Sequence, residues 1–129
     1  MIYSAQLRNV SNDVEGQVLL TINRKNLTCF AYSSLPPDAK EGSFYRVELT
    51  AEVLNEYVVS ELNGEALPSI TQVGNSFAYV IAGRLNRNRL DAGGIVFEDS
   101  ILLRDFGYLD GKMILWRIDR IDAEFLSDT

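Results

Sequence analysis

The sequence predicts a mainly β protein with little helix: either a small antiparallel barrel, of which an OB-like barrel is one form, or a β-sandwich. Nine glycines recur along the chain, and the runs between them are rich in Val, Ile, Leu, Tyr and Phe. Short β-prone runs between turn residues are typical of meandering β proteins. At 129 residues, of which 47% are hydrophobic, the chain suits a single β domain over residues 1–129.

The first strands are predicted near the N-terminus. Residues 2–8 alternate side chains between two faces, which indicates a strand. Residues 17–23 and 27–33 are β-prone and flank a short polar turn at residues 24–26, so we expect a hairpin there. The two prolines at residues 36–37 then interrupt the sheet, because proline has no N–H to donate to a ladder.

The clearest strand signal lies in residues 44–53, where apolar and polar side chains alternate throughout. A helix is the alternative, since Leu49, Val53 and Tyr57 would also form a helical stripe. The alternation begins before such a helix would begin. It therefore favours a strand with one buried face and one solvent-facing side.

Turn signals divide the rest of the chain. Asn-Gly at residues 63–64 adopts positive φ at both positions easily, so a type I′ hairpin is predicted between residues 57–62 and 66–70. Residues 119–126 fit either an extension of the preceding strand or a short C-terminal helix. The remaining strands are predicted at residues 76–82, 95–98, 101–104 and 112–118, with a turn at 91–94 and a loop at 106–111.

The composition excludes several kinds of site. With no histidine, the chain cannot form a Ser-His-Asp or Cys-His triad or the usual zinc site. Its one cysteine, Cys29, lies in an apolar stretch and is predicted to be buried. No phosphate-binding glycine motif occurs, so no cofactor is predicted. We find no signal peptide and no apolar run long enough to span a membrane, and therefore expect a cytoplasmic protein.

The charge is −6 from 12 basic and 18 acidic residues, and it is concentrated in residues 38–65, with seven acids and two bases. The strand predicted at residues 44–53 places Glu48 and Glu52 on its solvent-facing side, and Glu56 follows them. A negative surface attracts basic proteins and repels nucleic acid. Solubility alone is the alternative explanation. The leading prediction is a non-enzymatic protein that engages a protein partner, for example by neutralising a basic one as immunity proteins do.

A basic patch gives a second hypothesis, a single-stranded nucleic-acid binding module on an OB-like barrel. Arg84, Arg87 and Arg89 lie within six residues and follow the aromatic residues Phe77 and Tyr79. Arginines beside exposed rings grip single strands, because guanidinium groups pair with phosphates and rings stack on bases. The alternative is a solvated loop that neutralises nearby carboxylates, which the negative net charge favours.

Carboxylates give a third hypothesis, an enzyme that uses acidic residues or a metal ion. Asp119, Asp122 and Glu124 are close in sequence, but their spacing matches no calcium loop. Arginines interleave with them, which indicates surface ion pairing rather than a metal site. Self-association stays open as well, since the strand predicted at residues 112–118 could pair across a twofold axis.

Overall fold

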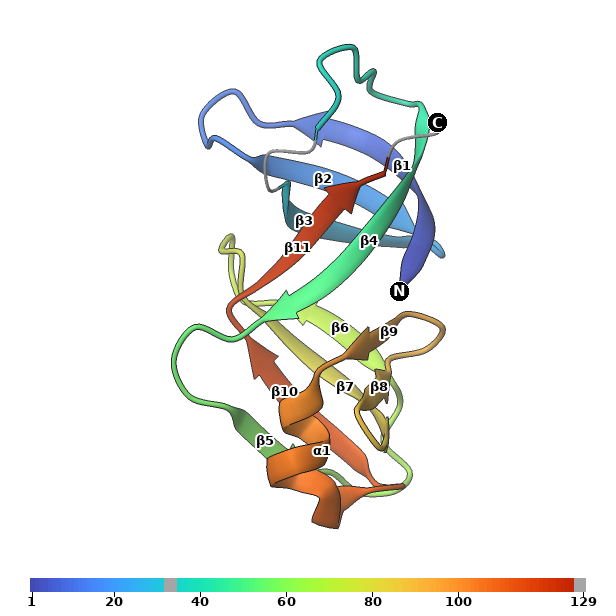
Figure 1. Cartoon of the computed structure of the whole chain (residues 1–129), viewed down its shortest axis with the longest axis vertical. Helices are drawn as coiled ribbons and strands as arrows, with labels where there is room; N and C mark the ends of the chain where they lie inside the picture. Colours follow the sequence, from blue (N-terminus) through green and yellow to red (C-terminus); the bar gives the residue numbers. More distant parts are fainter. Residues whose placement is uncertain (32–34, 127–129) are drawn as a thin grey trace.

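The computed structural model describes residues 1–31 and 35–126 (Figure 1). The protein is mainly β, as predicted, and five of its strands close into a barrel in the order β1-β2-β3-β11-β4, with β4 pairing back to β1. Neighbouring barrel strands are antiparallel except β3 and β11, which run parallel. The barrel strands are β1 (Ile2–Val10), β2 (Gln17–Ile22), β3 (Lys25–Ala31), β4 (Phe44–Glu52) and β11 (Arg120–Phe125).

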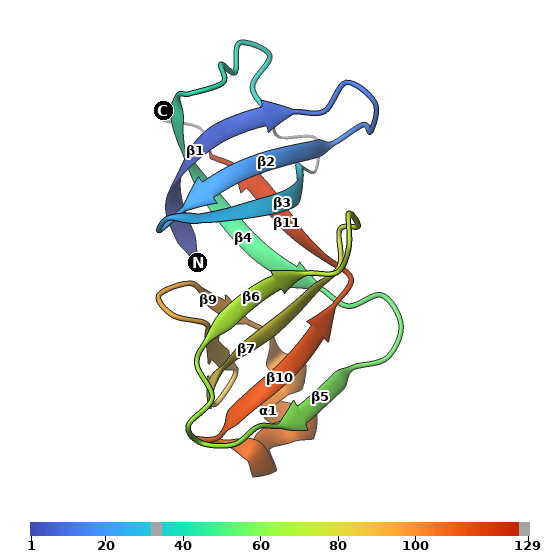
Figure 2. The same ribbon diagram turned by 180° about the vertical axis from the view of Figure 1, so that it is seen from behind.

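The segment between β4 and β11 forms a second sheet, below the barrel in Figure 1. Its strand order is β5-β10-β7-β8-β9, and β6 also pairs with β7. One short helix, α1, lies against one face of this sheet, so that β5, β10, β7 and β6 are seen in front of it in Figure 2. The elements are β5 (Val58–Glu61), β6 (Ser69–Gln72), β7 (Tyr79–Asn86), β8 (Arg89–Asp91), β9 (Val96–Glu98), α1 (Ser100–Phe106), the 3₁₀ turn η1 (Gly107–Leu109) and β10 (Met113–Ile118).

A single cluster of buried apolar side chains runs through the barrel and the second sheet. Leu20 and Ile121 belong to its barrel part, and Ile81 and Trp116 to its sheet part, each with at most 1% of its surface exposed. Cys29 is buried in the same cluster, as predicted, and burial raises the pKa of its thiol. The thiol is therefore a small apolar core group.

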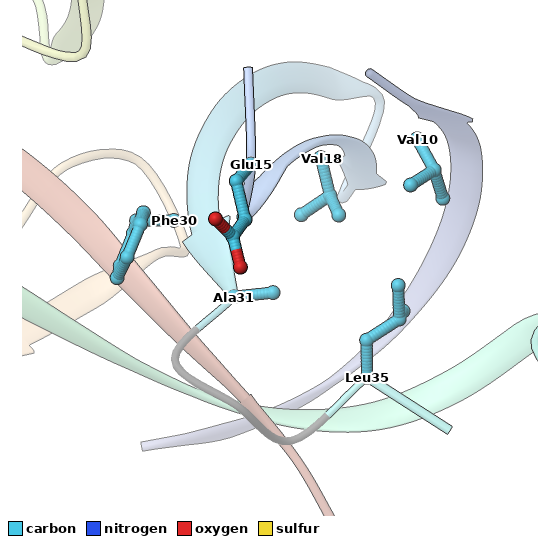
Figure 3. Close-up of a pocket in the computed structure, with 7 residues that line it drawn as sticks. Val10, Glu15, Val18, Phe30, Ala31 and Leu35 are labelled. Atoms are coloured by element: carbon cyan, nitrogen blue, oxygen red, sulfur yellow. The ribbon is translucent and has the colours of Figure 1, made fainter. Parts of the chain in front are cut away.

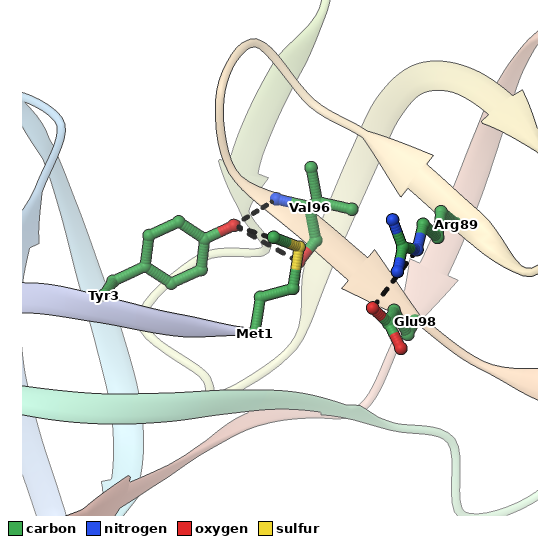
Figure 4. A network of polar contacts seen from close by, with 5 residues as sticks. All are labelled: Met1, Tyr3, Arg89, Val96 and Glu98. Carbon is green, nitrogen blue, oxygen red and sulfur yellow. Dashed lines mark hydrogen bonds and ion pairs between the residues drawn. The ribbon is translucent and has the colours of Figure 1, made fainter.

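Hydrogen bonds join the barrel to the second sheet at their shared boundary. The hydroxyl of Tyr3 on β1 accepts a hydrogen bond from the backbone N–H of Val96 on β9 at 2.7 Å (Figure 4). The hydroxyl of Tyr79 accepts one from the N–H of Thr28 on β3, at 2.8 Å. These contacts satisfy backbone groups that no neighbouring strand reaches.

Two turn predictions are wrong in position or partner. The first hairpin turns at Asn23 and Arg24, both with positive φ, rather than over residues 24–26, because a two-residue loop matches the strand twist. Asn63-Gly64 does not form a hairpin turn, since β5 pairs with β10 and β6 pairs with β7. Long-range pairing that buries Val59 against the core overrides the local turn signal.

Three other predictions need correction. The strand expected at residues 101–104 is helix α1, because Asp99 caps its first turn, its carboxylate accepting from the N–H of Ile101 at 2.9 Å. Within residues 119–126, Arg120–Phe125 form strand β11, so the segment is not a helix; it is a separate barrel strand rather than an extension of β10. β7 continues to Asn86, so Arg84 lies in a strand and not in a loop. The end of the predicted 27–33 strand falls partly outside the described residues.

Candidate functional site

The outer face of β4 and β11 carries a row of acidic side chains, together with two arginines, Arg46 on β4 and Arg120 on β11. Glu48 on β4 lies directly opposite Glu124 on β11, and both are exposed. Among the described residues, neither carboxylate forms an ion pair with a cation. Like charges at opposing positions of two strands destabilise the sheet. The register therefore places two like charges at opposing positions, where one incoming cation would interact with both.

A second acidic pair lies further along the same face. Arg120 on β11 lies opposite Glu52 but donates to Asp122, with its Nε 2.7 Å from a carboxylate oxygen. The guanidinium also lies over the ring of Phe30, 4.7 Å from its centroid. Partial burial, followed by the charge of Asp122, raises the pKa of Glu52. Arg120 thus compensates Asp122 more directly than Glu52.

Glu56 does not belong to this face. It lies in the loop between β4 and β5 and is exposed. It lines a small groove with Val58, Arg117 and Asp119, in which the Asp119 carboxylate accepts a hydrogen bond from the N–H of Leu54 at 2.6 Å. Of the three predicted partner-binding residues, the structure brings together Glu48 and Glu52 only.

The three arginines of the basic patch lie on the hairpin between β7 and β8. Arg84 donates to the backbone carbonyl of Gly111 at 2.6 Å. Arg89 forms an ion pair with Glu98, with 3.2 Å between Nε and the nearer carboxylate oxygen (Figure 4). Arg87 is at the turn with positive φ, and its backbone N–H bonds to Asp110. Two of these side chains are therefore already engaged within the chain.

The aromatic residues predicted to accompany these arginines lie elsewhere. Tyr79 begins β7, at the opposite end from the hairpin, and only 2% of its surface is exposed. Phe77 is half-buried and packs edge-on against Phe30 of the barrel, with the ring centroids 6.0 Å apart. The structure does not assemble the rings and the arginines into one surface.

A pocket of about 470 Å³ opens at one end of the barrel. Its wall is apolar apart from one carboxylate, Glu15, which points into the opening (Figure 3). The chain on its rim includes Ala31 and Leu35, which flank residues outside the described ranges. The lining residues are Val10, Glu15, Gly16, Val18, Phe30, Ala31 and Leu35.

The carboxylates considered as a metal site lie on the outward side of β11 and in the connection between β10 and β11. Asp122 and Glu124 point outward from β11, while Asp119 bonds to the chain near β5. No group of three or more His, Cys, Asp or Glu side chains suited to a metal ion occurs in residues 1–31 and 35–126. Residues 120–125 alternate apolar and polar side chains as β4 does, so the sequence indicates a strand with Glu124 on its outward side. It does not reveal that this strand pairs with β4 and places Glu124 opposite Glu48.

Over residues 1–126 the chain matches the family described as "Uncharacterised conserved protein UCP019853". The chain belongs to this family. No curated protein and no solved structure matches it. In the described part of the chain, no helix is both long and apolar enough to cross a membrane.

Proposed function

We propose that this family member is a protein-binding module that engages a basic partner through the outer face of β4 and β11. The observation that carries the proposal is the opposed pair Glu48 and Glu124, two exposed carboxylates that form no ion pair within residues 1–31 and 35–126. A Lys or Arg side chain from a partner would bind both carboxylates and remove their repulsion. The binding energy then includes relief of an unfavourable contact as well as a new ion pair.

Apolar side chains next to the acidic row support a protein partner rather than a free cation. Ile2 on β1 lies opposite Glu48 on its other side and is 48% exposed. Phe44, at the start of β4, is 67% exposed. Protein interfaces combine exposed apolar anchors of this kind with a polar rim. The acidic row sets the charge of the partner, and these two side chains supply contact area.

Charge reversal at the acidic row tests the proposal. We expect Glu48→Lys/Glu124→Lys to abolish retention of a basic partner by the tagged full chain in an extract of its native host. The matched control is Asp13→Lys/Glu15→Lys, which changes the net charge equally in the exposed 11–16 loop and should retain the partner. Equal loss in both variants would show only a general charge effect, and retention by both would refute the proposal.

A second candidate, single-stranded nucleic-acid binding, draws on the barrel topology. The strand order β1-β2-β3-β11-β4, with a parallel β3–β11 pair, is the order we expect of an OB-like barrel. Such barrels bind oligonucleotides on the face of their second and third strands, where Phe30 is half-buried beside Arg120. We expect Arg120→Ala to weaken single-strand binding at low salt. A gel shift without retardation of the native protein at low salt would eliminate this candidate.

A further inference from the structure

Strand β5 is an open edge of the second sheet (Figure 2). Of the described strands it pairs only with β10, in a register confirmed by the hydrogen bond from the N–H of Leu62 to the carbonyl of Met113, at 2.8 Å. Antiparallel pairing alternates bonded and unbonded residues, so Val58 and Ser60 bond to β10 and Val59 and Glu61 face outward. No hydrogen bond among the described residues uses the outward backbone groups of Val59 or Glu61.

At β9, by contrast, the outward backbone N–H and C=O groups have a hydrogen-bond partner. Val96 also has its backbone groups facing away from its neighbour, β8, but there the Tyr3 hydroxyl lies 2.7 Å from its nitrogen and 3.4 Å from its oxygen (Figure 4). β5 has no such cap. It also lacks the proline, lysine or bulge with which proteins usually protect an edge, and its one charged residue is Glu61.

The surroundings of β5 are acidic and apolar together. Glu56 precedes the strand, Glu61 ends it and Glu65 follows it, and all three are exposed. Three of the most exposed large apolar side chains lie in this part of the chain: Leu54 before β5, Val58 at its start, and Leu67 in the loop that leads to β6. At the start of β5, the groove that holds Glu56 also contains Val58. An added strand would therefore meet free backbone groups at Val59 and Glu61 and, at the start of β5, a groove with two carboxylates, Glu56 and Asp119, and one cation, Arg117.

We propose that the β5 edge accepts an extended basic segment of a partner protein as an additional strand. The proposal goes beyond the proposed function, because it concerns a different surface and names the mode by which a basic partner binds there, β-strand addition. The backbone groups of Val59 and Glu61 would bond to the added strand, and its basic side chains would meet Glu56 and Glu61. A second copy of this chain is a poorer occupant, because its β5 strand carries no basic side chain to meet Glu56 and Glu61.

The test uses a short synthetic peptide of alternating Lys and Val as the probe, added to the isotope-labelled full chain and followed by NMR. We expect the amide signals of Val59 and Glu61 to shift and their hydrogen exchange to slow. A peptide N-methylated at alternate positions, which cannot form the ladder, should lose binding. A peptide with Glu in place of Lys should bind at least tenfold more weakly.

Matched variants separate the edge from its charge. Glu61→Pro removes an outward N–H without breaking a bond to β10, and should weaken Lys-Val peptide binding about tenfold relative to Glu61→Gln. Gln72→Pro is the control, because Gln72 also faces outward but on the uncharged edge of β6, and it should leave binding unchanged.

Equal affinity for native protein and Glu61→Pro, or shifts confined to β4 and β11, would overturn strand addition at β5. Complete absence of peptide binding would overturn it as well. These results leave the proposed function testable on its own, because the loss of the partner by the Glu48→Lys/Glu124→Lys variant depends on the barrel face and not on β5. If Glu61→Pro weakens the peptide while the barrel variant keeps its partner, the edge stands and the barrel face fails.

Discussion

The barrel and the second sheet differ in how their edge strands are paired. Both are built from strands with one apolar face, but the barrel closes on itself and so has no open edge along its ring. The second sheet stays open, with α1 on one face and β5 at an edge (Figure 2). What each region of the described chain presents to solvent therefore differs: carboxylates without an ion-pair partner on the barrel surface, and backbone groups without a strand partner on the sheet. These are the two places where we propose binding.

The largest expected effect concerns the core that both regions share. Leu20 is fully buried in the barrel, so Leu20→Ala should lower the free energy of unfolding by about 2–5 kcal/mol. Because the core is continuous, the fluorescence of Trp116, which lies in the second sheet, should report the same lowered urea midpoint as circular dichroism. Leu103→Ala, on the exposed side of α1, is the control and should change stability by about 0.5 kcal/mol or less. Separate transitions for the two probes would divide the chain into two folding units.

Replacing glycine by alanine should affect stability differently in a strand of the second sheet, at Gly83, and in a loop between its strands, at Gly64. A Cβ on Gly83 would lie 2.3 Å from the backbone oxygen of Asp91, so Gly83→Ala must displace β8 and should cost about 1–3 kcal/mol. Gly64 has open space around it and no positive φ, so Gly64→Ala should be neutral or slightly stabilising. Urea denaturation of both variants measures the difference. If Gly64→Ala were destabilised, residue 64 would need the conformational freedom of glycine, as the predicted hairpin turn requires.

One hydrogen bond between the barrel and the second sheet can be removed by deleting a single oxygen atom. Tyr3→Phe removes the hydroxyl that accepts from Val96, leaving that N–H without its partner, and should cost about 1 kcal/mol. Hydrogen exchange at Val96 should accelerate, while exchange in the centre of β2 stays slow. Tyr108→Phe, at a residue that is 75% exposed, is the control and should leave both unchanged. Unaltered exchange at Val96 in Tyr3→Phe would mean that β9 is closed by something other than this hydroxyl.

The sequence predicts the barrel better than the second sheet, and the reason is the range of the contacts. β4 was predicted within a residue, because its alternation depends only on one apolar and one polar face. β5 was predicted as part of a hairpin, because its true partner, β10, is separated from it by more than fifty residues in the chain. Local turn propensity at residues 63–64 cannot compete with the burial that the distant pairing provides.

The candidate site shows the same division. The sequence places Glu48 and Glu52 on one face, since they are four residues apart on a strand. It cannot place Glu124 opposite Glu48, because register between distant strands is set by packing. The sequence predicts strands on both sides of Asp99 and Ser100, although Asp is also a favoured helix cap. The same residue types are favoured at helix N-caps and in turns, so the sequence alone does not distinguish the two at this position.

A smaller effect is expected from the acidic row itself. Glu48→Gln removes the repulsion from Glu124, and should raise the free energy of unfolding by about 0.2–1 kcal/mol at low salt. The gain should shrink in high salt, because both carboxylates are exposed. In a Glu124→Gln background the same change should have no further benefit, and a double-mutant cycle measures that coupling. An undiminished gain in that background would assign the effect to something other than this pair.

The smallest effect is the pH dependence contributed by Glu52. Partial burial and then Asp122 raise the pKa of this carboxyl in the folded protein above its unfolded value. Its contribution to stability is therefore fully present below the unfolded pKa and is lost as the pH rises through the folded pKa. The stability of the native protein relative to Glu52→Gln should fall as the pH rises through this window. In an Asp122→Asn background the fall should be shallower, since the nearby negative charge is gone. A difference that rises with pH would instead mean that Arg120, opposite Glu52 across the two strands, dominates the carboxyl.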